Sequence, residues 1–371
     1  MLAAPMAGDL GVSTPTVFAA FSVALGVSAL AGPGAGGAID RHGGRPVLMA
    51  TSGLFALGLV ALGLAQGAWS LFAAWALIGL TMGCGLYEAA FASLVRLYGH
   101  GARNAITGIT LFAGFASTVG WPLTTLLEAQ FGWRGACFAW AAMHLLIGFP
   151  LNASLPRAAA PGAAQDPVQA AETGTPRPAA DLPVARAGLI TALLAFVFAA
   201  TWFISTAMAA HLPRLLQATG ASLAVAVGVG ALVGPAQVAG RLLEFGFLRH
   251  VHPLLSARLA ALGHPLGVLA LMIAGPALAP LFAVLHGAGN GILTIAKGTL
   301  PLVLFGPGGY GARQGWLMMP ARVTQALSPF LFGVVLDRWG AGALWLSAGL
   351  GLAACLALWA LPRMPVLAKP D

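Results

Sequence analysis

Apolar stretches of about twenty residues recur along almost all of this 371-residue chain and exclude most other kinds of structure. Each is long enough to cross the roughly 30 Å hydrocarbon core of a bilayer as a helix. The stretches do not alternate polar and apolar residues, as the strands of a membrane β-barrel would. Charged residues make up only 8% of the chain, against about 25% in an average soluble domain. The sequence therefore predicts an all-α polytopic membrane protein.

Eleven membrane-spanning helices are predicted from these stretches. They cover residues 16–38, 47–66, 70–95, 105–127, 133–155, 187–211, 221–243, 255–275, 278–304, 314–336 and 341–362. One set of span ends and connecting or terminal segments holds Arg41, Arg45, Arg96, Arg103, Arg157, Arg177, Arg186, Arg241, Arg249, Arg258, Arg313, Arg363 and Lys369. The other set holds only Arg134, Arg214 and Arg338.

Cytoplasmic loops of membrane proteins are enriched in Lys and Arg. The first set is therefore predicted to be cytoplasmic, together with the C-terminus and the segment 156–186. The net charge of +8 thus reflects membrane topology, and we expect no nucleic-acid partner. The predicted location is the cytoplasmic (inner) membrane.

Neither the cysteines nor any glycine-rich segment indicates a cofactor or an enzyme. Cys84, Cys137 and Cys355 lie inside apolar stretches without pairing or metal-ligand spacing, which favours small buried side chains. The chain has no nucleotide-binding P-loop and no constellation of a nucleophile with its base. We expect no cofactor, no bound metal and no enzymatic activity.

The chain repeats itself across a proline-rich linker at residues 156–186. Gly36, Asp40 and Arg45 recur with the same spacing as Gly240, Glu244 and Arg249. Two further segments recur in the same order, 83–90 as 289–296 and 101–104 as 311–314. Because both copies of each segment fall on the predicted cytoplasmic side, the repeat is parallel, as in one large class of transporters. The predicted domains are residues 1–155, the linker 156–186, and residues 187–371.

Residues 36–45, "GGAIDRHGGR", resemble the cytoplasmic signature G-x-x-x-D-R-x-G-R-[RK] of the major facilitator superfamily. Residues Gly36, Asp40, Arg41, Gly43 and Arg45 match it. Gly44 departs from it, because the family usually has an arginine there. "GWR" at 132–134 is similar to the family's opening of its sixth helix, and "GVVLDRWG" at 333–340 repeats the signature late in the chain.

This resemblance covers the whole chain and implies a fold and a mechanism. The fold would be two six-helix bundles related by a pseudo-two-fold axis, with a solute site between them and alternating access. The protein would be a monomer. One helix is then missing, and we expect it upstream of Met1, with residues 5–13 as the loop that follows it. The signature segment would form a breakable contact at the cytoplasmic mouth, although its residues alone also suit a simple positive-inside turn.

Ionisable residues at membrane depth are costly and therefore indicate function. On the span 278–304, one helical face carries His286, Asn290, Thr294 and Lys297. On the span 314–336, the equivalent stripe carries Met318, Arg322 and Gln325. On the span 70–95 it carries Thr81, Cys84 and Glu88. A weakly polar stripe on the span 105–127, without an ionisable residue, includes Thr107, Thr110, Gly114, Ser117 and Trp121.

These stripes predict a shared aqueous cavity, although Ser, Thr and Asn often only bridge neighbouring helices. His144 and His264 are lone histidines on apolar helices, which favours a structural role. The substrate and proton pathway is accordingly predicted at Glu88, Arg322, Lys297, Asn290, His286 and Gln325.

The leading function is secondary transport of a small organic or oxyanionic solute, coupled to protons. Arg322 is predicted to contact the anionic group. Glu88 and Lys297 are predicted to form an ion pair that is made in one conformation and broken in another. Two alternatives stay open. One is efflux of toxic compounds by proton antiport, although the family's antiporter pattern is absent at 114–125. The other is a non-transporting sensor on the same fold.

Overall fold

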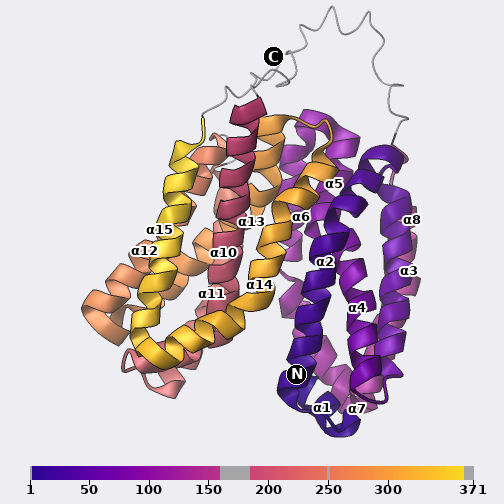
Figure 1. Ribbon diagram of the computed structural model, residues 1–371, viewed down its shortest axis with the longest axis horizontal. Helices are drawn as coiled ribbons and strands as arrows, with labels where there is room; N and C mark the ends of the chain where they lie inside the picture. Colours follow the sequence, from indigo (N-terminus) through magenta and orange to yellow (C-terminus); the bar gives the residue numbers. More distant parts are fainter. Residues whose placement is uncertain (1, 159–183, 249–250, 363–371) are drawn as a thin grey trace, which may run out of the picture. The chain divides into compact units, whose positions relative to one another are not determined.

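The computed structural model describes residues 2–158, 184–248 and 251–362, and within these ranges it contains helices and no strand (Figure 1). Its described residues divide into two compact units. Unit 1 comprises Met1–Ala102, Ala116–Pro178 and Gly306–Met319, and unit 2 comprises Arg103–Phe115, Ala179–Phe305 and Pro320–Asp371. Most of the predicted linker lies outside the described residues. The predicted domain boundaries stay predictions. Each unit also includes one short segment from the other half of the chain, Gly306–Met319 in unit 1 and Arg103–Phe115 in unit 2.

Unit 1 is built from the helices of the first half of the chain. They are α1 (Ala3–Leu10), α2 (Thr14–His42), α3 (Gly44–Gly63), α4 (Ala68–Gly85), α5 (Tyr87–Tyr98), α7 (Ala116–Met143) and α8 (Phe149–Ala153). Ser13 begins α2 by accepting a hydrogen bond from the Thr16 amide at 3.2 Å, which is a standard N-cap. The first ten residues of α14 (Tyr310–Trp339) complete the unit.

Unit 2 is built from the second half of the chain together with α6 (Ala102–Ala113). Its other helices are α10 (Val184–Ala218), α11 (Leu223–Gly246), α12 (Pro253–Ala274), α13 (Ala279–Phe305), the remainder of α14, and α15 (Ala343–Ala360). Its core gathers Ile204, Met208, Val268, Phe282 and Phe332 from α10, α12, α13 and α14.

Eight stretches of the described chain are helical, long and apolar enough to cross a membrane. Three of them run 46, 53 and 51 residues, which is enough for two crossings each at about twenty residues per crossing. The eight stretches therefore accommodate the eleven predicted spans. Large apolar side chains are also exposed on the helices, including Trp69, Phe112 and Ile273. Exposed apolar surface of this extent suits lipid rather than water, and the protein is a multi-pass membrane protein.

Several predicted helices differ from the observed ones. The span 70–95 is interrupted at Leu86, whose extended backbone (φ −93°, ψ −157°) separates α4 from α5. Thr81, Cys84 and Glu88 therefore do not share one continuous helical face, and that part of the prediction is wrong. The span 105–127 is likewise divided between α6 and α7.

Two further segments near the N-terminus and in α7 bear on the resemblance. Residues 3–10 form helix α1, so the loop expected at 5–13 is confined to its last three residues. The backbone within α7 changes direction at Gly132, where φ is +69°. This break lies where the "GWR" segment was expected to open a new helix.

Equivalent helix pairs in the two units pack backbone to backbone. In unit 1, a Cβ on Gly79 of α4 would lie 2.6 Å from Ala24 Cα of α2, so only glycine fits there. In unit 2, a Cβ on Gly287 of α13 would lie 2.6 Å from the Val233 oxygen of α11. Small residues at such crossings are how membrane helices approach closely. The same device at α2–α4 and at α11–α13 is the structural counterpart of the sequence repeat.

Candidate functional site

The signature segment ends α2, and its aspartate caps another helix. Asp40 accepts hydrogen bonds from the amides of Gly311 and Ala312, each at 2.9 Å, at the start of α14. The first amides of a helix have no partner within the helix, and a negative charge is favourable beside them. Both residues belong to unit 1, so this cap is part of that unit's own packing.

The remaining signature residues have separate roles. Gly36 lies against the backbone of Gly311, where a side chain on either residue would collide with the other helix. Gly43 ends α2 with a φ of +82°, a conformation that favours glycine. Arg41 is exposed, and Arg45 is half-buried in the first turn of α3. The structure thus assigns close packing, capping and chain reversal to three of the five matched residues.

Unit 2 has a counterpart at the end of α11. Glu244 is buried and lies 3.7 Å from the guanidinium of Arg103 on α6. Arg103 also donates to the carbonyl of Val251 at 2.8 Å. Gly240 packs against Ala288 of α13, where a Cβ would lie 2.9 Å from the Ala288 Cα. Arg249 lies outside the described residues.

Sequence reasoning counted several basic residues only as topology markers, yet they hold these helix ends together. Arg103 pairs with Glu244, Arg241 donates to the Thr110 carbonyl at 3.1 Å, and Arg96 donates to the Asp40 carbonyl at 3.2 Å. The recurrence of 101–104 as 311–314 pointed to the right segments. It did not reveal that these segments are the partners of Asp40 and Glu244.

Within unit 2, two basic side chains of the predicted pathway approach one indole ring. Lys297 Nζ of α13 lies 4.3 Å from the centre of the Trp202 ring of α10, and Arg322 Cζ of α14 lies 5.9 Å from it. Lys297 and Arg322 are only 5% and 6% exposed. We call these three residues the Trp202 site. Because α14 begins at Tyr310 rather than at 314, Arg322 lies about 18 Å along its helix.

Two buried polar atoms, one in the Trp202 site and one a helical turn from Arg322, have no hydrogen-bond partner among the described residues. The indole Nε1 of Trp202 is buried and has no hydrogen-bond acceptor among the described residues. On α14, one turn from Arg322, the buried Oε1 of Gln325 likewise has no donor among them. Leaving such groups unsatisfied costs free energy, and a ligand that supplies the missing hydrogen bonds would recover it.

Other predicted pathway residues lie elsewhere. Glu88 is half-buried in the first turn of α5, directly after the break at Leu86. It belongs to unit 1 and Lys297 to unit 2, so their predicted ion pair stays a prediction. Asn290 of α13 donates to the Ser205 hydroxyl of α10 at 3.0 Å and so bridges two helices.

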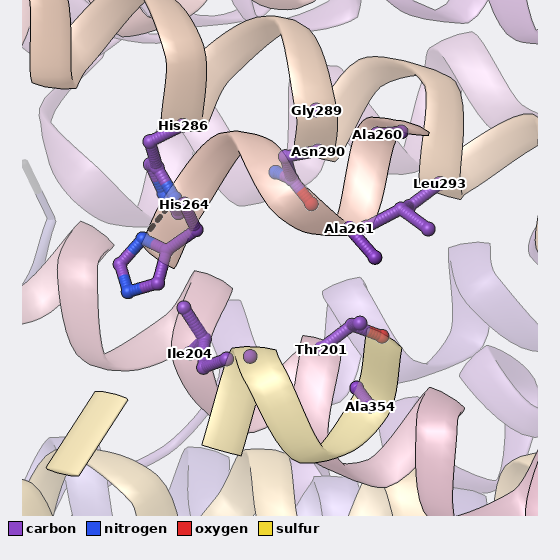
Figure 2. Close-up of a pocket in the computed structure, with 11 residues that line it drawn as sticks. Thr201, Ile204, Ala260, Ala261, His264, His286, Gly289, Asn290, Leu293 and Ala354 are labelled. Atoms are coloured by element: carbon purple, nitrogen blue, oxygen red, sulfur yellow. Dashed lines mark hydrogen bonds between the residues drawn. The ribbon is translucent and has the colours of Figure 1, made fainter. Parts of the chain in front are cut away.

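His286 faces His264 of the neighbouring helix α12. The two Nδ1 atoms lie 3.0 Å apart, and His264 Nε2 lies 3.0 Å from the Ser347 hydroxyl. Both rings border a small cavity of about 30 Å³, which Asn290 and Thr201 also line (Figure 2). Sequence reasoning treated His264 as a lone histidine and missed this pair. The two residues are far apart in the chain, and neither belongs to a recognisable motif.

Comparisons with known proteins agree with the architecture. One relative is a protein from Thermoproteus tenax, described as an uncharacterized 38 kDa protein in a 23S RNA operon. It is 29% identical to this chain over 367 residues, which make up 98% of this chain and 90% of the relative. The proton:xylose symporter XylE, bound to 6-bromo-6-deoxy-D-glucose, has a TM-score of 0.73 at 14% identity and covers 96% of this chain and 90% of its own. The human organic anion transporter MFSD10 (TETRAN) has a TM-score of 0.62 at 19% identity, covering 96% and 88%.

At these identities the two solved structures show a shared fold and nothing about the solute. The family follows from the sequence itself. Residues 1–283, more than half of the chain, match the model of the Major Facilitator Superfamily. The protein therefore belongs to the Major Facilitator Superfamily, a family of secondary transporters.

Proposed function

We propose that this transporter moves a small organic or inorganic oxyanion across the cytoplasmic membrane, together with a proton. The observation that carries the proposal is the Trp202 site. Two buried cations approach one indole ring whose N–H has no acceptor among the described residues. A carboxylate or another oxyanion would accept that N–H and lie beside both cations.

Arg322 and Lys297 would contribute differently to such a site. Guanidinium offers a planar fork of donors that matches a carboxylate or phosphate, whereas ammonium acts as a compact point charge. Charge-assisted hydrogen bonds of this kind are roughly twice as strong as neutral ones. Gln325 could orient a hydroxyl or a protonated group of the same solute, because its unsatisfied Oε1 is an acceptor.

The structural neighbours do not select the solute. One is described as a symporter of xylose and protons, the other as a transporter of organic anions. A sugar carries no charge that would complement the two cations beside the ring. The residues of the Trp202 site therefore favour an anion over a sugar.

The contacts of Asp40 and Glu244 would serve as the cytoplasmic gate. α14 runs from unit 1 into unit 2, and Asp40 caps its first turn. α6 reaches from the end of unit 1 into unit 2, where Arg103 meets Glu244. Both contacts lie where the chain passes between units. Each contact lies within one unit, so the proposed gate would open when α14 or α6 moves away from the carboxylate that holds it.

Ligand-induced thermal stabilisation of the purified protein tests the proposal. The panel contains lactate, succinate, benzoate, sulfate and phosphate as anions, glucose and xylose as neutral solutes, and choline as a cation. We expect at least one anion to raise the unfolding temperature, because a ligand that binds only the folded state stabilises it. Arg322→Gln should lower the affinity for that anion by about a hundredfold, since removing a buried charged partner costs roughly 2–5 kcal/mol.

Two further variants make the test specific. Trp202→Phe keeps an aromatic face but removes the N–H, and it should lower affinity by about tenfold. Arg338→Gln removes an exposed arginine at the end of α14, the helix that carries Arg322, and should leave the affinity for the anion unchanged. Stabilisation by a sugar or by choline alone, or anion binding that survives Arg322→Gln unchanged, would refute the proposal.

A further inference from the structure

A pair of buried histidines in unit 2 is not explained by anion binding. His264 of α12 and His286 of α13 point toward one another, with their Nδ1 atoms 3.0 Å apart (Figure 2). The exposed fractions of the two side chains are 7% and 4%. Burying ionisable side chains inside membrane helices costs free energy, so such residues indicate a function.

Close packing of α12 and α13 holds the two rings in contact. A Cβ on Gly263 would lie 2.7 Å from the Leu285 oxygen, and a Cβ on Gly289 would lie 2.6 Å from the Ala260 oxygen. The residues beside His264 and His286 therefore press backbone against backbone. On the third side, Gly351 of α15 leaves room for the His264 ring, whose Cδ2 lies 3.6 Å from where a Cβ would be.

The hydrogen bonds assign the protons of the neutral pair. Ser347 donates its single hydroxyl proton to the Leu344 carbonyl at 2.8 Å, so its oxygen accepts from His264 Nε2 at 3.0 Å. A neutral imidazole carries one ring proton. His264 Nδ1 is therefore an acceptor, and His286 Nδ1 must donate to it. This leaves Nε2 of His286 as the ring nitrogen without a proton.

His286 Nε2 is available to take a proton. No described residue hydrogen-bonds to it, and His286 lines the cavity of about 30 Å³ beside the pair. A cavity of that size holds one or two water molecules, which could deliver a proton. The His286 ring also lies parallel to the Phe282 ring, with ring centres 5.9 Å apart and planes 8° apart. The face of an aromatic ring stabilises a cation held against it.

No charged side chain lines this cavity among the described residues. The groups that face it are Thr201 of α10, Asn290 of α13 and the two histidines, with Ser347 of α15 behind His264. The charged residues on the surrounding helices lie elsewhere. Arg241 and Glu244 of α11 contact α6, Arg258 of α12 donates to the carbonyls of Leu358 and Leu361, and Lys297 of α13 lies at the Trp202 ring. On α10, Arg214 pairs with Asp337 and Arg186 is exposed at the start of the helix. The pair is therefore the titratable group of this cavity.

We propose that the hydrogen-bonded row of side chains His286–His264–Ser347 is the proton-binding site of this transporter. A proton from hydronium in the bulk passes through the cavity water to Nε2 of His286, and neutral water is left behind. The product is one imidazolium that still donates through Nδ1 to His264. The hydrogen bonds from His286 to His264, from His264 to Ser347 and from Ser347 to Leu344 are all kept, so no rearrangement is needed when His286 becomes charged. This inference rests on the proposed function for its role in coupling.

The location of the pair suits a proton that travels with an anion. His286 and Lys297 lie on one face of α13, about 16 Å apart along the helix. Thr201 lines the cavity, and the next residue along α10 is Trp202. A positive charge on His286 would thus attract an anion at the Trp202 site and raise its affinity by a few-fold.

Solid-state NMR of the full-length protein in lipid bilayers, with ¹⁵N-labelled histidine, tests the proton site without any solute. At about pH 8 we expect His286 to carry its proton on Nδ1 and His264 on Nε2. As the pH is lowered from about 8, His286 should be the first of the two to gain a proton, on Nε2, while His264 stays neutral. His286→Asn keeps a donor toward His264 and should lower proton uptake by about one per molecule.

The controls separate this site from other histidines and from the anion site. His144→Asn removes a histidine that stacks on Phe55 in unit 1, and the pair's signals should not change. If His286→Asn does not fold, Ser347→Ala identifies the pair instead, because it should move the His264 Nε2 signal. A pair that stays neutral until acid unfolds the protein, that protonates His264 before His286, or that carries the opposite tautomers, overturns this inference. A pair that titrates in a protein that no anion stabilises overturns only the proposed solute.

Discussion

At residue 44 the chain has glycine where the signature of its family usually has arginine, and the neighbouring helix explains the difference. A Cβ at Gly44 would collide with the Ser93 side chain of α5 and lie 3.1 Å from the Ser93 Cα. The first turn of α3 therefore packs directly on α5. The signature in this protein has exchanged a charge for a closer contact between these two helices.

This exchange predicts a paired effect of substitutions. Gly44→Ala should destabilise the protein by about 1–3 kcal/mol through overpacking. Ser93→Gly in the same chain should recover part of that loss by removing the obstructing side chain. The matched control is Gly53→Ala in the same helix, where nothing lies within 4 Å of the added atom. That control should be neutral or stabilising. Thermal unfolding in detergent measures all three variants against the unchanged protein, and equal effects at residues 44 and 53 would contradict the explanation.

At the scale of helices, the two repeats join their ends by different chemistry. Asp40 bonds two backbone amides of α14, whereas Glu244 lies beside the side chain of Arg103 on α6. The longer side chain of Glu reaches a guanidinium, and the shorter Asp reaches the backbone. The first contact depends on the exposed amides of a helix start, and the second on a buried pair of charges.

The cap at α14 can be tested by amide exchange. Asp40→Ala removes the acceptor of the Gly311 and Ala312 amides, and losing such a cap costs about 0.5–2 kcal/mol. Hydrogen exchange at these two amides should accelerate by about 2- to 30-fold, because 1.4 kcal/mol corresponds to a factor of ten. Arg41→Ala, one residue along and exposed, should leave their exchange unchanged. Equal acceleration in both variants would show that the carboxylate of Asp40 is not the cap.

At the scale of the whole molecule, the apolar side chains on the outside of the helices indicate that the protein is surrounded by lipid. Leu352 lies in the middle of α15 and is 49% exposed, although that helix has no charged residue along its length. In water such a surface would aggregate, whereas in a bilayer it is satisfied by lipid. The helix is thus stable as a membrane span and not as a surface helix of a soluble protein.

A charge at this position should be costly. Leu352→Arg is expected to destabilise the inserted protein by about 2.5–3.5 kcal/mol, the cost of arginine at the centre of a membrane helix. Leu352→Phe, which keeps an apolar side chain at the same place, should have little effect. Folded yield and unfolding temperature in lipid nanodiscs measure both variants. If Leu352→Arg is as stable as Leu352→Phe, residue 352 faces water rather than lipid.

The family and the membrane character were predictable from the sequence, and both predictions are confirmed. The signature around Asp40 and the length of the apolar stretches are local properties that the chain displays without folding. The sequence also drew attention to Lys297, Arg322 and His286, because charged or titratable residues are rare in such stretches. It gave no signal for Trp202, since an indole in an apolar helix is ordinary.

The sequence by itself thus determined that the chain crosses a membrane repeatedly, and which rare polar residues its helices carry into it. Only the tertiary structure decided which of them meet. It brought Lys297 and Arg322 to Trp202, and His264 to His286 and Ser347. The physical reason is that a polar stripe on an apolar helix does not show which neighbouring helix it will meet, because that depends on how the helix is rotated in the bundle. That rotation is set by close contacts between helices, such as Gly263 against Leu285, which exist only after the chain has folded.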